Sequence, residues 1–361
     1  MGGTSPILHR RHQPTRRPQR PARKPPDGNC VETATHPRRA LVLGVNGQDG
    51  SYLAEHLLDQ GWAVCGVGRQ TASRWVAPAP TFKYVCLDLS DVPQLAALMQ
   101  EYRPDAIYHV AAVHGSAGFQ YESRWQDVHL VNTVSAHAVL EYLRVTAPHA
   151  SLVYASSSKV FGDPLPLQIS ESSPRHSNCI YSTTKNAATD LIRYYRARHQ
   201  TKASVVWTFN HESPRRGSSY FIPRIVETLA SAILDRQHIG KIGALGFWSD
   251  WGDASEFMDT VACIANQPAG CDFVLASGKA LWATDFVEIL FKKYGLRWTD
   301  HLLLATQEPL ERPPQWSADI SAVQQATGKA IARTVYDVCE EILRQNHPAA
   351  WAQVAPHGVS K

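Results

Sequence analysis

Short apolar runs alternate with longer segments whose apolar residues recur every three or four positions, as far as about residue 208. The short runs are typical of buried strands, and the longer segments are typical of amphipathic helices. Strands are predicted at 40–43, 63–67, 84–87, 106–110, 151–155 and 203–208, and helices at 51–60, 92–102, 128–145 and from the segment holding Tyr181 to about 199. This alternation predicts an α/β fold of Rossmann type, with a doubly wound parallel sheet.

The alternation weakens after about residue 210, where loops, helices and short strands are predicted. Such a pattern is expected of a smaller C-terminal substrate-binding lobe attached to the sheet. We therefore expect a basic Pro/Arg-rich tail at 1–38, a nucleotide-binding Rossmann domain at 39–210, a substrate-binding lobe with returning elements at 211–345, and a C-terminal tail at 346–361.

The charge of the chain is concentrated at its start. The formal net charge is +4, but residues 1–29 alone carry +6, so the remainder is mildly acidic and offers no case for nucleic-acid binding. The first segment is rich in Pro and Arg and lacks hydrophobic periodicity, which predicts a disordered tail or an over-extended reading frame. A tail that contacts an anionic surface and an organellar presequence are the remaining alternatives.

Cysteine usage predicts reduced thiols and a cytoplasmic protein. The 7 cysteines are scattered and lack the spacing of a metal site, so no metal is expected. No apolar run approaches the length that spans a membrane, so no membrane partner is expected either.

A glycine-punctuated loop joins the first predicted strand to the first helix. Gly44, Gly47 and Gly50 are spaced as Gly-x-x-Gly-x-x-Gly, with Gln48 and Asp49 between the last two glycines. Glycines at such positions allow a tight turn, close approach of the backbone to a pyrophosphate and close packing of helix on strand. The free N–H groups of the helix start favour phosphate binding. The loop predicts a dinucleotide cofactor.

The end of the second strand bears on which nicotinamide cofactor binds. An acid at this place bonds the adenosine ribose, whereas an arginine accepts the 2′-phosphate of NADP. The stretch after Val67 has no acid but has Arg69, which favours NADP over NAD. Asp88 and Leu89 follow the third strand and are expected to border the adenine. Ala111 and Ala112 follow the fourth and are small enough for the cofactor to lie across them.

Tyr181 and Lys185 are separated by one helical turn, so both side chains lie on the same face. An ammonium group beside a phenol favours the phenolate, which can remove a hydroxyl proton while a nicotinamide takes the hydride from the same carbon. The pair also follows a run of three serines that includes Ser157. This arrangement predicts a dehydrogenase-type catalytic centre.

With these residues in place, the chain resembles the extended short-chain dehydrogenase/reductase superfamily and, within it, the GDP-mannose 4,6-dehydratases. The local matches are Gly44 to Glu55, Phe209 to Gly217, Asp250 to Ala254 and Arg312-Pro313. The resemblance extends over about residues 39–345. It implies NADP-dependent hydride transfer at C4 of a nucleotide-diphosphate sugar, most simply one of GDP-mannose type.

The resemblance also implies roles for individual residues. Ser157 matches the residue that hydrogen-bonds the sugar 4-hydroxyl, Tyr181 the base, and Lys185 the residue that binds the nicotinamide ribose and tunes the tyrosine. Asn210, Arg224 and Arg312 match contacts to the nucleotide diphosphate, for which an arginine fork is well suited. The loop with Arg215 and Arg216 resembles a segment that helps subunits assemble around the cofactor, which implies a homodimer or homotetramer.

Several positions depart from the family pattern, all on the substrate side. Lys159 occupies the position of the glutamate that acts as acid and base when water is lost across C5 and C6. Ser249 replaces an arginine, and Gln315 replaces an acid. His114, an expected substrate contact, replaces a small polar residue. Loss of such an acid–base group commonly lowers a rate by about 10²- to 10⁴-fold.

These departures leave alternatives open. The family points to 4,6-dehydration, with another acid such as Glu171 replacing the missing glutamate and Lys159 pointing outward. The individual residues favour chemistry that stops at C4, as in a 4-epimerase or a 4-keto-sugar reductase. A non-catalytic nucleotide sensor or scaffold is a third possibility, but it would not need a tuned phenol.

Overall fold

The computed structural model describes residues 37–116, 118–306 and 311–355. Nearly all of the tail expected at 1–38 lies outside these residues. The described part belongs to one compact unit, Pro37–Lys361. No helix among the described residues is both long enough and apolar enough to cross a membrane.

A seven-stranded sheet forms the centre of this unit, and all of its neighbouring strands pair in parallel. In spatial order its strands are β3 (Phe82–Cys86), β2 (Ala63–Gly68), β1 (Arg39–Leu43), β4 (Ala106–His109), β5 (Ser151–Ser157), β7 (Lys202–Thr208) and β11 (Asp272–Leu275). The predicted doubly wound parallel sheet is confirmed. Leu43 is in register with both Val67 and His109, so neighbouring strands end at the same edge.

Two layers of helices cover the sheet, and alternate residues of β1 supply the two cores. Leu41 and Leu43 belong to the core beneath α2 (Val92–Tyr102), α4 (Ser135–Val145) and α5 (Ile180–His199). Ala40 and Val42 belong to the core beneath α1 (Gln48–Asp59) and α7 (Ala254–Ile264). This alternation is the period-two pattern of a strand that is buried on both faces.

The helix expected at 128–145 has a more complex form. It begins as α3 (Trp125–His129), passes through a π-helical turn at 130–134, and continues as α4. Asn132 in this turn is fully buried and accepts a hydrogen bond from the backbone N–H of Val113. Single π turns inside α-helices often mark functional sites, and this one anchors the loop that follows β4.

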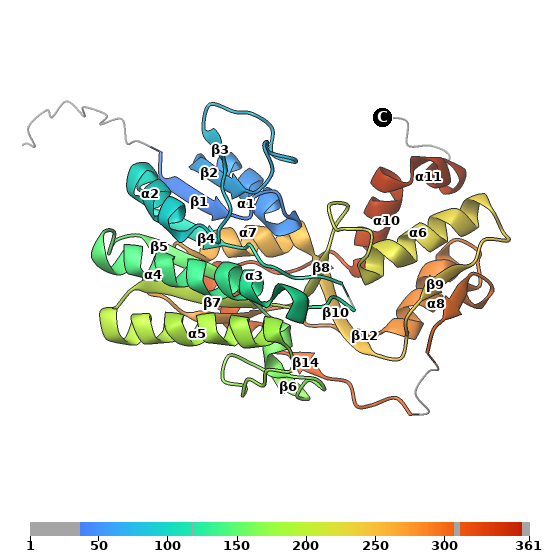
Figure 1. Cartoon of the computed structure of the whole chain (residues 1–361). Helices are drawn as coiled ribbons and strands as arrows, with labels where there is room; N and C mark the ends of the chain where they lie inside the picture. Colours follow the sequence, from blue (N-terminus) through green and yellow to red (C-terminus); the bar gives the residue numbers. More distant parts are fainter. Residues whose placement is uncertain (1–36, 117, 307–310, 356–361) are drawn as a thin grey trace, which may run out of the picture. The chain divides into compact units, whose positions relative to one another are not determined.

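A second group of elements has its own hydrophobic core. This core lies between α6, α8 and α10 and includes Ile222, Phe286 and Val338. Figure 1 shows these helices grouped with α11. The elements are β8 (Asn210–Glu212), α6 (Phe221–Leu234), β9 (Gly240–Ile242), β10 (Trp248–Asp253), β12 (Ala280–Trp282), α8 (Ala283–Lys293), β13 (Leu302–Leu304), α10 (Val335–Asn346) and α11 (Pro348–Val354).

Some segments of the later chain pack against the central sheet, as returning elements would, and one helix lies within the segment expected as a tail. Strand β11 and helix α7 pack on the first sheet, against β7 and α1. The segment expected as a tail from residue 346 contains α11, which buries Ala350 and packs on α6 and α10. The other strands and helices of the described residues are β6 (Gln168–Ile169), β14 (Ser317–Ala318), α9 (Ser321–Thr327) and three short 3₁₀ helices, Glu122–Arg124, Ser158–Phe161 and Trp298–Asp300.

Candidate active site

A pocket of about 850 Å³ lies at the carboxyl edge of the central sheet, where ligands bind in open α/β folds. Fifteen of the residues predicted from sequence line it: Gly44, Gly47, Gln48, Asp49, Gly50, Arg69, Asp88, Leu89, Ala111, Ala112, His114, Ser157, Tyr181, Lys185 and Asn210. The fold therefore brings the predicted cofactor residues and the predicted catalytic residues to one cavity.

Two predicted substrate residues are not among those that line the pocket. Arg224 is exposed and donates a hydrogen bond to the carbonyl of Lys241. Arg312 is exposed and forms a two-pronged ion pair with Asp285, above the ring of Trp282. Both cations have partners within the chain.

The glycine loop is held so closely that side chains are excluded at two of its positions. Gly44 has a φ of +101°, and a Cβ there would lie 2.8 Å from the Cα of Ala111. A Cβ on Gly50 would lie 2.2 Å from the carbonyl oxygen of Gly44. Helix α1 begins directly after Gly47, so its first N–H groups border the pocket. This cradle fits a pyrophosphate.

A buried hydroxyl at the end of β5 also fits a polar ligand. Ser156 lines the pocket and is 3% exposed, and its Oγ has no hydrogen-bond partner among the described residues. Unpartnered buried polar groups are unusual and call for a specific reason. The glycine cradle and this hydroxyl together fit a nicotinamide dinucleotide.

Two arginines stand where the adenosine half of such a cofactor is expected. Arg69 follows β2, and Arg74 follows five residues later; both are exposed and line the pocket. Asn46 of the glycine loop fixes the segment between them. Its side chain donates to the carbonyl of Ala72 and accepts from the backbone N–H of Arg74. Sequence analysis identified Arg69 but missed Arg74, which belongs to no strand or helix.

Tyr181 and Lys185 lie in the first turns of α5, beside the end of β5. Tyr181 is 6% exposed, and its phenol shares a hydrogen bond with the side chain of Ser157. Lys185 is 1% exposed; its Nζ donates to the carbonyl of Ala155 at 2.7 Å and lies 5.8 Å from the centre of the Tyr181 ring. The predicted arrangement of serine, tyrosine and lysine is thus brought together at one point.

The electrostatics of this pair differ from the simple expectation. Burial raises the pKa of Tyr181 well above its ordinary value, against the opposing effect of the hydrogen bond with Ser157. Burial lowers the pKa of Lys185 to about 7, although the carboxylate of Asp49 partly opposes this shift. Burial, and not the ammonium group, therefore dominates the acidity of the phenol in the ligand-free pocket.

A buried ion pair that sequence analysis missed supports the same region. The ring of His211 places Nε2 2.9 Å from Asp49 Oδ1 and Nδ1 2.7 Å from the carbonyl oxygen of Phe209. Because both nitrogens face acceptors, the ring carries both protons. Burial lowers the pKa of His211, but Asp49 more than offsets this and raises it. The pair joins the start of α1 to β8.

Position 159, where the family resemblance implies a glutamate, is occupied by a lysine. The side chain of Lys159 is exposed, and its backbone N–H donates to Ser157 Oγ. Glu171, the acid considered as an alternative, is not among the residues that line the pocket, and its carboxylate accepts a hydrogen bond from the backbone N–H of Val274 in β11. Among the described residues, the acids that line the pocket are Asp49 and Asp88.

Aromatic rings cluster beside Tyr181; His114 and Tyr220 line the pocket, and Tyr121 is not among the lining residues. The ring of His114 is centred 4.4 Å from that of Tyr181, and the ring of Tyr121 is centred 5.8 Å from it. The guanidinium of Arg216 lies 3.8 Å above the ring of Tyr220. Tyr121 and Tyr220 were not predicted, because neither belongs to a motif near Tyr181 in the sequence.

Two further substitutions on the substrate side have structural partners. Ser249 is buried and accepts a hydrogen bond from the side chain of Asn210 at 2.8 Å. Gln315 donates to the carbonyl of Ala280.

Among the described residues, no group of three or more His, Cys, Asp or Glu side chains is placed to hold a metal ion.

The sequence model of a family described as GDP-mannose 4,6 dehydratase matches residues 41–316. The chain belongs to the GDP-mannose 4,6-dehydratase family. The resemblance inferred from its motifs is thereby confirmed. As a member of this family, the chain is an enzyme of the nucleotide-sugar dehydratase and epimerase type within the short-chain dehydrogenase/reductases.

Individual relatives agree with this assignment. A GDP-mannose 4,6-dehydratase from Sordaria araneosa is 32% identical over 268 residues; the match covers 72% of this chain but 49% of that protein. This chain thus spans about half the length of that relative. A GDP-mannose 4,6-dehydratase from Yersinia enterocolitica is 30% identical over 273 residues, which cover 72% of this chain and 73% of the relative.

Solved structures share the fold at lower sequence identity. A dTDP-glucose 4,6-dehydratase from Bacillus anthracis, in complex with NAD, matches with a TM-score of 0.71 at 16% identity, covering 86% of this chain and 97% of the other. A UDP-glucose 4-epimerase from Thermotoga maritima, with UDP-glucose, matches with a TM-score of 0.73 at 13% identity, covering 86% and 99%. The family fold thus hosts more than one reaction.

Proposed function

We propose that this family member is an NADP-dependent enzyme that oxidises C4 of a nucleotide-diphosphate sugar of GDP-mannose type. The observation that carries the proposal is the meeting of Ser157, Tyr181 and Lys185 in the cavity that the glycine loop borders. A sugar hydroxyl that reaches Tyr181 from this cavity would find the base and the hydrogen-bonding serine on the same side.

Tyr181 is the base in this mechanism. Its oxygen takes the proton of the 4-hydroxyl, and the hydrogen bond with Ser157 holds that oxygen in place and favours its ionised form. Lys185, fixed by the carbonyl of Ala155, supplies an adjacent cationic or hydrogen-bonding group. A bound oxidised nicotinamide cofactor would supply the hydride acceptor and a positive charge.

NADP is the proposed cofactor, with NAD as the alternative. Arg69 and Arg74 offer two guanidinium groups to a 2′-phosphate, and the segment between them has no acid that would prefer a free ribose hydroxyl. Gly44, Gly47 and Gly50 would hold the pyrophosphate, Asp88 and Leu89 the adenine, and Ala111 and Ala112 the middle of the cofactor. Lys185 would contact the nicotinamide ribose.

Substrate contacts are proposed for His114, Ser157 and Asn210, which line the pocket. Arg224 and Arg312 would reach the nucleotide diphosphate only by leaving the Lys241 carbonyl and Asp285. We also propose that the protein forms the homodimer or homotetramer that the family resemblance implies. Arg215 of the loop in question is already bound to Ser51 and Glu55 of the same chain.

A second candidate is a 4-epimerase or a 4-keto-sugar reductase, and the observation that favours it is the absence of a carboxylate at Lys159. Both reactions need oxidation or reduction at C4 but no elimination of water. The non-catalytic sensor is the weakest candidate, because a buried lysine beside a buried phenol destabilises a fold that has no use for it.

The test is an assay of the purified protein with GDP-mannose and NADP, with 4-keto sugar detected by mass spectrometry. Product is expected from the wild type. Tyr181→Phe should lose about 10²- to 10⁴-fold in rate and keep its affinity for NADP, because only the proton acceptor is removed. Turnover at the wild-type rate in this variant would show that another group is the base. Cofactor binding without product from any nucleotide sugar would favour the sensor.

A further inference from the structure

His114 stands on the substrate side of the pocket and is held firmly there. It follows β4, and the neighbouring Val113 N–H donates to the side chain of Asn132 at 2.9 Å. The same amide of Asn132 donates to Thr184 of α5, the helix that carries Tyr181. The loop with His114 is therefore anchored to the catalytic helix, and the two rings lie 4.4 Å apart, tilted by 31°.

One nitrogen of this imidazole is engaged and the other is not. Nδ1 lies 2.7 Å from the hydroxyl of Tyr121, and the Tyr121 oxygen also accepts from the backbone of Gly115. Within residues 37–116, 118–306 and 311–355, Nε2 has no hydrogen-bond partner. An imidazole that is oriented through one nitrogen and presents the other to a ligand is the usual form of a histidine acid–base group.

The surroundings of His114 keep the ring neutral. Burial lowers its pKa to about 3, and the cations of Arg216, Lys185 and Lys159 add to this effect, while Asp49 opposes it. A glutamate in water has a pKa of roughly 4.3. The imidazole is thus somewhat less basic than a glutamate in water, and it is in its neutral form near pH 7.

The remaining groups of the pocket leave a gap in proton transfer. Asp49 is committed to its ion pair with His211. Asp88 follows β3, four strands away from β5, which corresponds to roughly 19 Å at the spacing of strands in a sheet. Lys159 is exposed and bears the wrong charge for a base. Apart from Lys185, which is held by the carbonyl of Ala155, His114 is the neutral base beside Tyr181 among the described residues that line the pocket.

We propose that His114 is a second acid–base residue of this site, which takes the C5 proton of a 4-keto nucleotide sugar through Nε2, with Tyr121 as its positioning residue. The inference rests on the proposed function, because it presupposes a 4-keto sugar in this pocket. In this proposal His114, and not the residue at position 159, is the base that removes the C5 proton.

Proton transfer from C5 to His114 produces an enolate. The C5–H bond breaks, the proton bonds to Nε2, and the electron pair passes into an enolate whose negative charge rests on the C4 oxygen. Return of the proton to C5 restores the ketone. When the C6–O bond breaks instead, the enolate electrons form the C5–C6 double bond, and the imidazolium proton leaves with that oxygen as water.

Deuterium exchange tests this step without any turnover of the cofactor. A GDP-linked 4-keto-6-deoxymannose is incubated with the protein in D2O, and deuterium at C5 is followed by NMR. Wild type should catalyse the exchange above the rate without protein. His114→Gln, which keeps a hydrogen-bonding side chain but no base, should lose about 10²- to 10⁴-fold. Tyr121→Phe should lower kcat for exchange and leave KM nearly unchanged.

A second histidine–tyrosine pair in the chain provides a matched control. His137 Nε2 lies 2.9 Å from the hydroxyl of Tyr195, and neither residue lines the pocket. His137→Gln should exchange at the wild-type rate.

Three outcomes would overturn the inference. The first is that wild type catalyses no exchange. The second is that a His114→Gln variant that binds the ligand normally exchanges at the wild-type rate. The third applies if His114→Gln does not fold: it is that Tyr121→Phe exchanges at the wild-type rate. The proposed function fails separately, if wild type with NADP yields no 4-keto product from any nucleotide sugar.

Discussion

At the scale of single residues, Lys185 is a buried group of the candidate site whose charged form lowers stability. Its side chain is 1% exposed, and its pKa falls from 10.5 to about 7 because burial penalises the charged form. A pKa difference of this size corresponds to about 5 kcal/mol at about 1.4 kcal/mol per unit. The fold therefore sacrifices stability to keep an amine beside Tyr181.

This cost has a defined pH dependence. The unfolded lysine keeps its proton up to about pH 10.4, whereas the folded one loses its proton near pH 7. Between these values the unfolded state binds more protons, so the stability of the ligand-free protein should rise with pH in this window. Below pH 7 both states are charged and the penalty is fully present.

Lys185→Met should accordingly stabilise the ligand-free protein while it abolishes catalysis. At pH 6 the free energy of unfolding should increase by about 1–3 kcal/mol, less than the full penalty because the bond to Ala155 is lost. At pH 9 the gain should be smaller, since the wild-type amine is then neutral. Urea unfolding at both values measures the effect, and a variant less stable than wild type at pH 6 would contradict it.

At the scale of elements, we expect the loop after β2 to govern the choice between NADP and NAD. Asn46 holds this loop at Ala72 and Arg74, so that both Arg69 and Arg74 border the pocket. Each charge-assisted hydrogen bond to a 2′-phosphate is worth about 1.5–3 kcal/mol. If NADP is the cofactor, a loop fixed in this way should make selectivity for it depend on two cations and not on one.

Arg69→Ala and Arg74→Ala should each weaken NADP binding by about 10- to 100-fold. NAD, which lacks the 2′-phosphate, should bind to either variant with nearly its wild-type affinity and thus serves as the control ligand. Isothermal titration of each variant with both cofactors measures the difference. An equal loss of affinity for NAD and NADP would mean that these arginines support the loop and do not read the phosphate.

The elements also show how far the sequence reaches. Strands β1 to β5 and the helices between them follow from hydrophobic period, and the glycine loop follows from local backbone needs. The position of β11 beside β7 does not follow, because a four-residue strand has no long-range signal of its partner. For the same reason the pairs His211–Asp49 and His114–Tyr121 were missed: their members meet only after folding.

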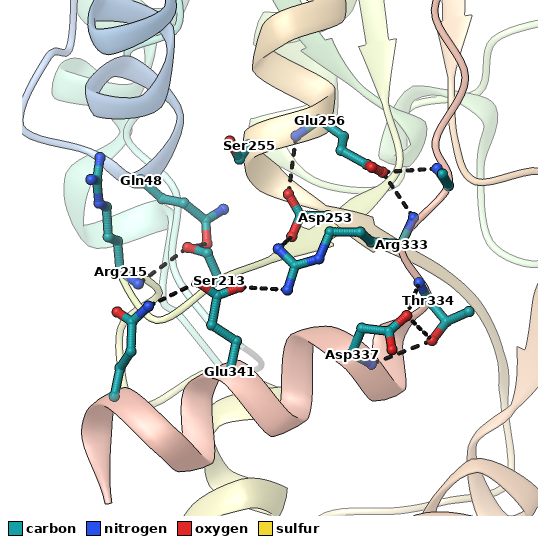
Figure 2. Close-up of polar contacts among 12 residues, drawn as sticks. Gln48, Ser213, Arg215, Asp253, Ser255, Glu256, Arg333, Thr334, Asp337 and Glu341 are labelled. Carbon is teal, nitrogen blue, oxygen red and sulfur yellow. Dashed lines mark hydrogen bonds and ion pairs between the residues drawn. The ribbon is translucent and has the colours of Figure 1, made fainter. Parts of the chain in front are cut away.

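At the scale of the whole described unit, a polar network joins α7, which packs on the central sheet, to α10, which belongs to the core between α6, α8 and α10 (Figure 2). Arg333 pairs with Asp253, which caps the start of α7, and with Glu341 of α10. Helix α7 packs on α1, the helix of the glycine loop. At the other end of α10, Asn346 donates to the carbonyl of Pro214 in the pocket wall. Arg333 thus joins the start of α7 to α10, whose last residue, Asn346, lines the pocket.

Arg333→Met tests this coupling, because it keeps the length of the side chain and removes the charge. Asp253 is 3% exposed in its side chain and would lose its cation, so unfolding should become easier by about 1–3 kcal/mol; the partial exposure of Arg333 keeps the effect below that of a fully buried pair. The matched control is Arg297→Met, whose pair with Asp300 is exposed and 3.9 Å long, and which should change stability by less than about 0.5 kcal/mol. If the two substitutions changed the free energy of unfolding in urea equally, the ion pairs of Arg333 would not stabilise the contact between α7 and α10.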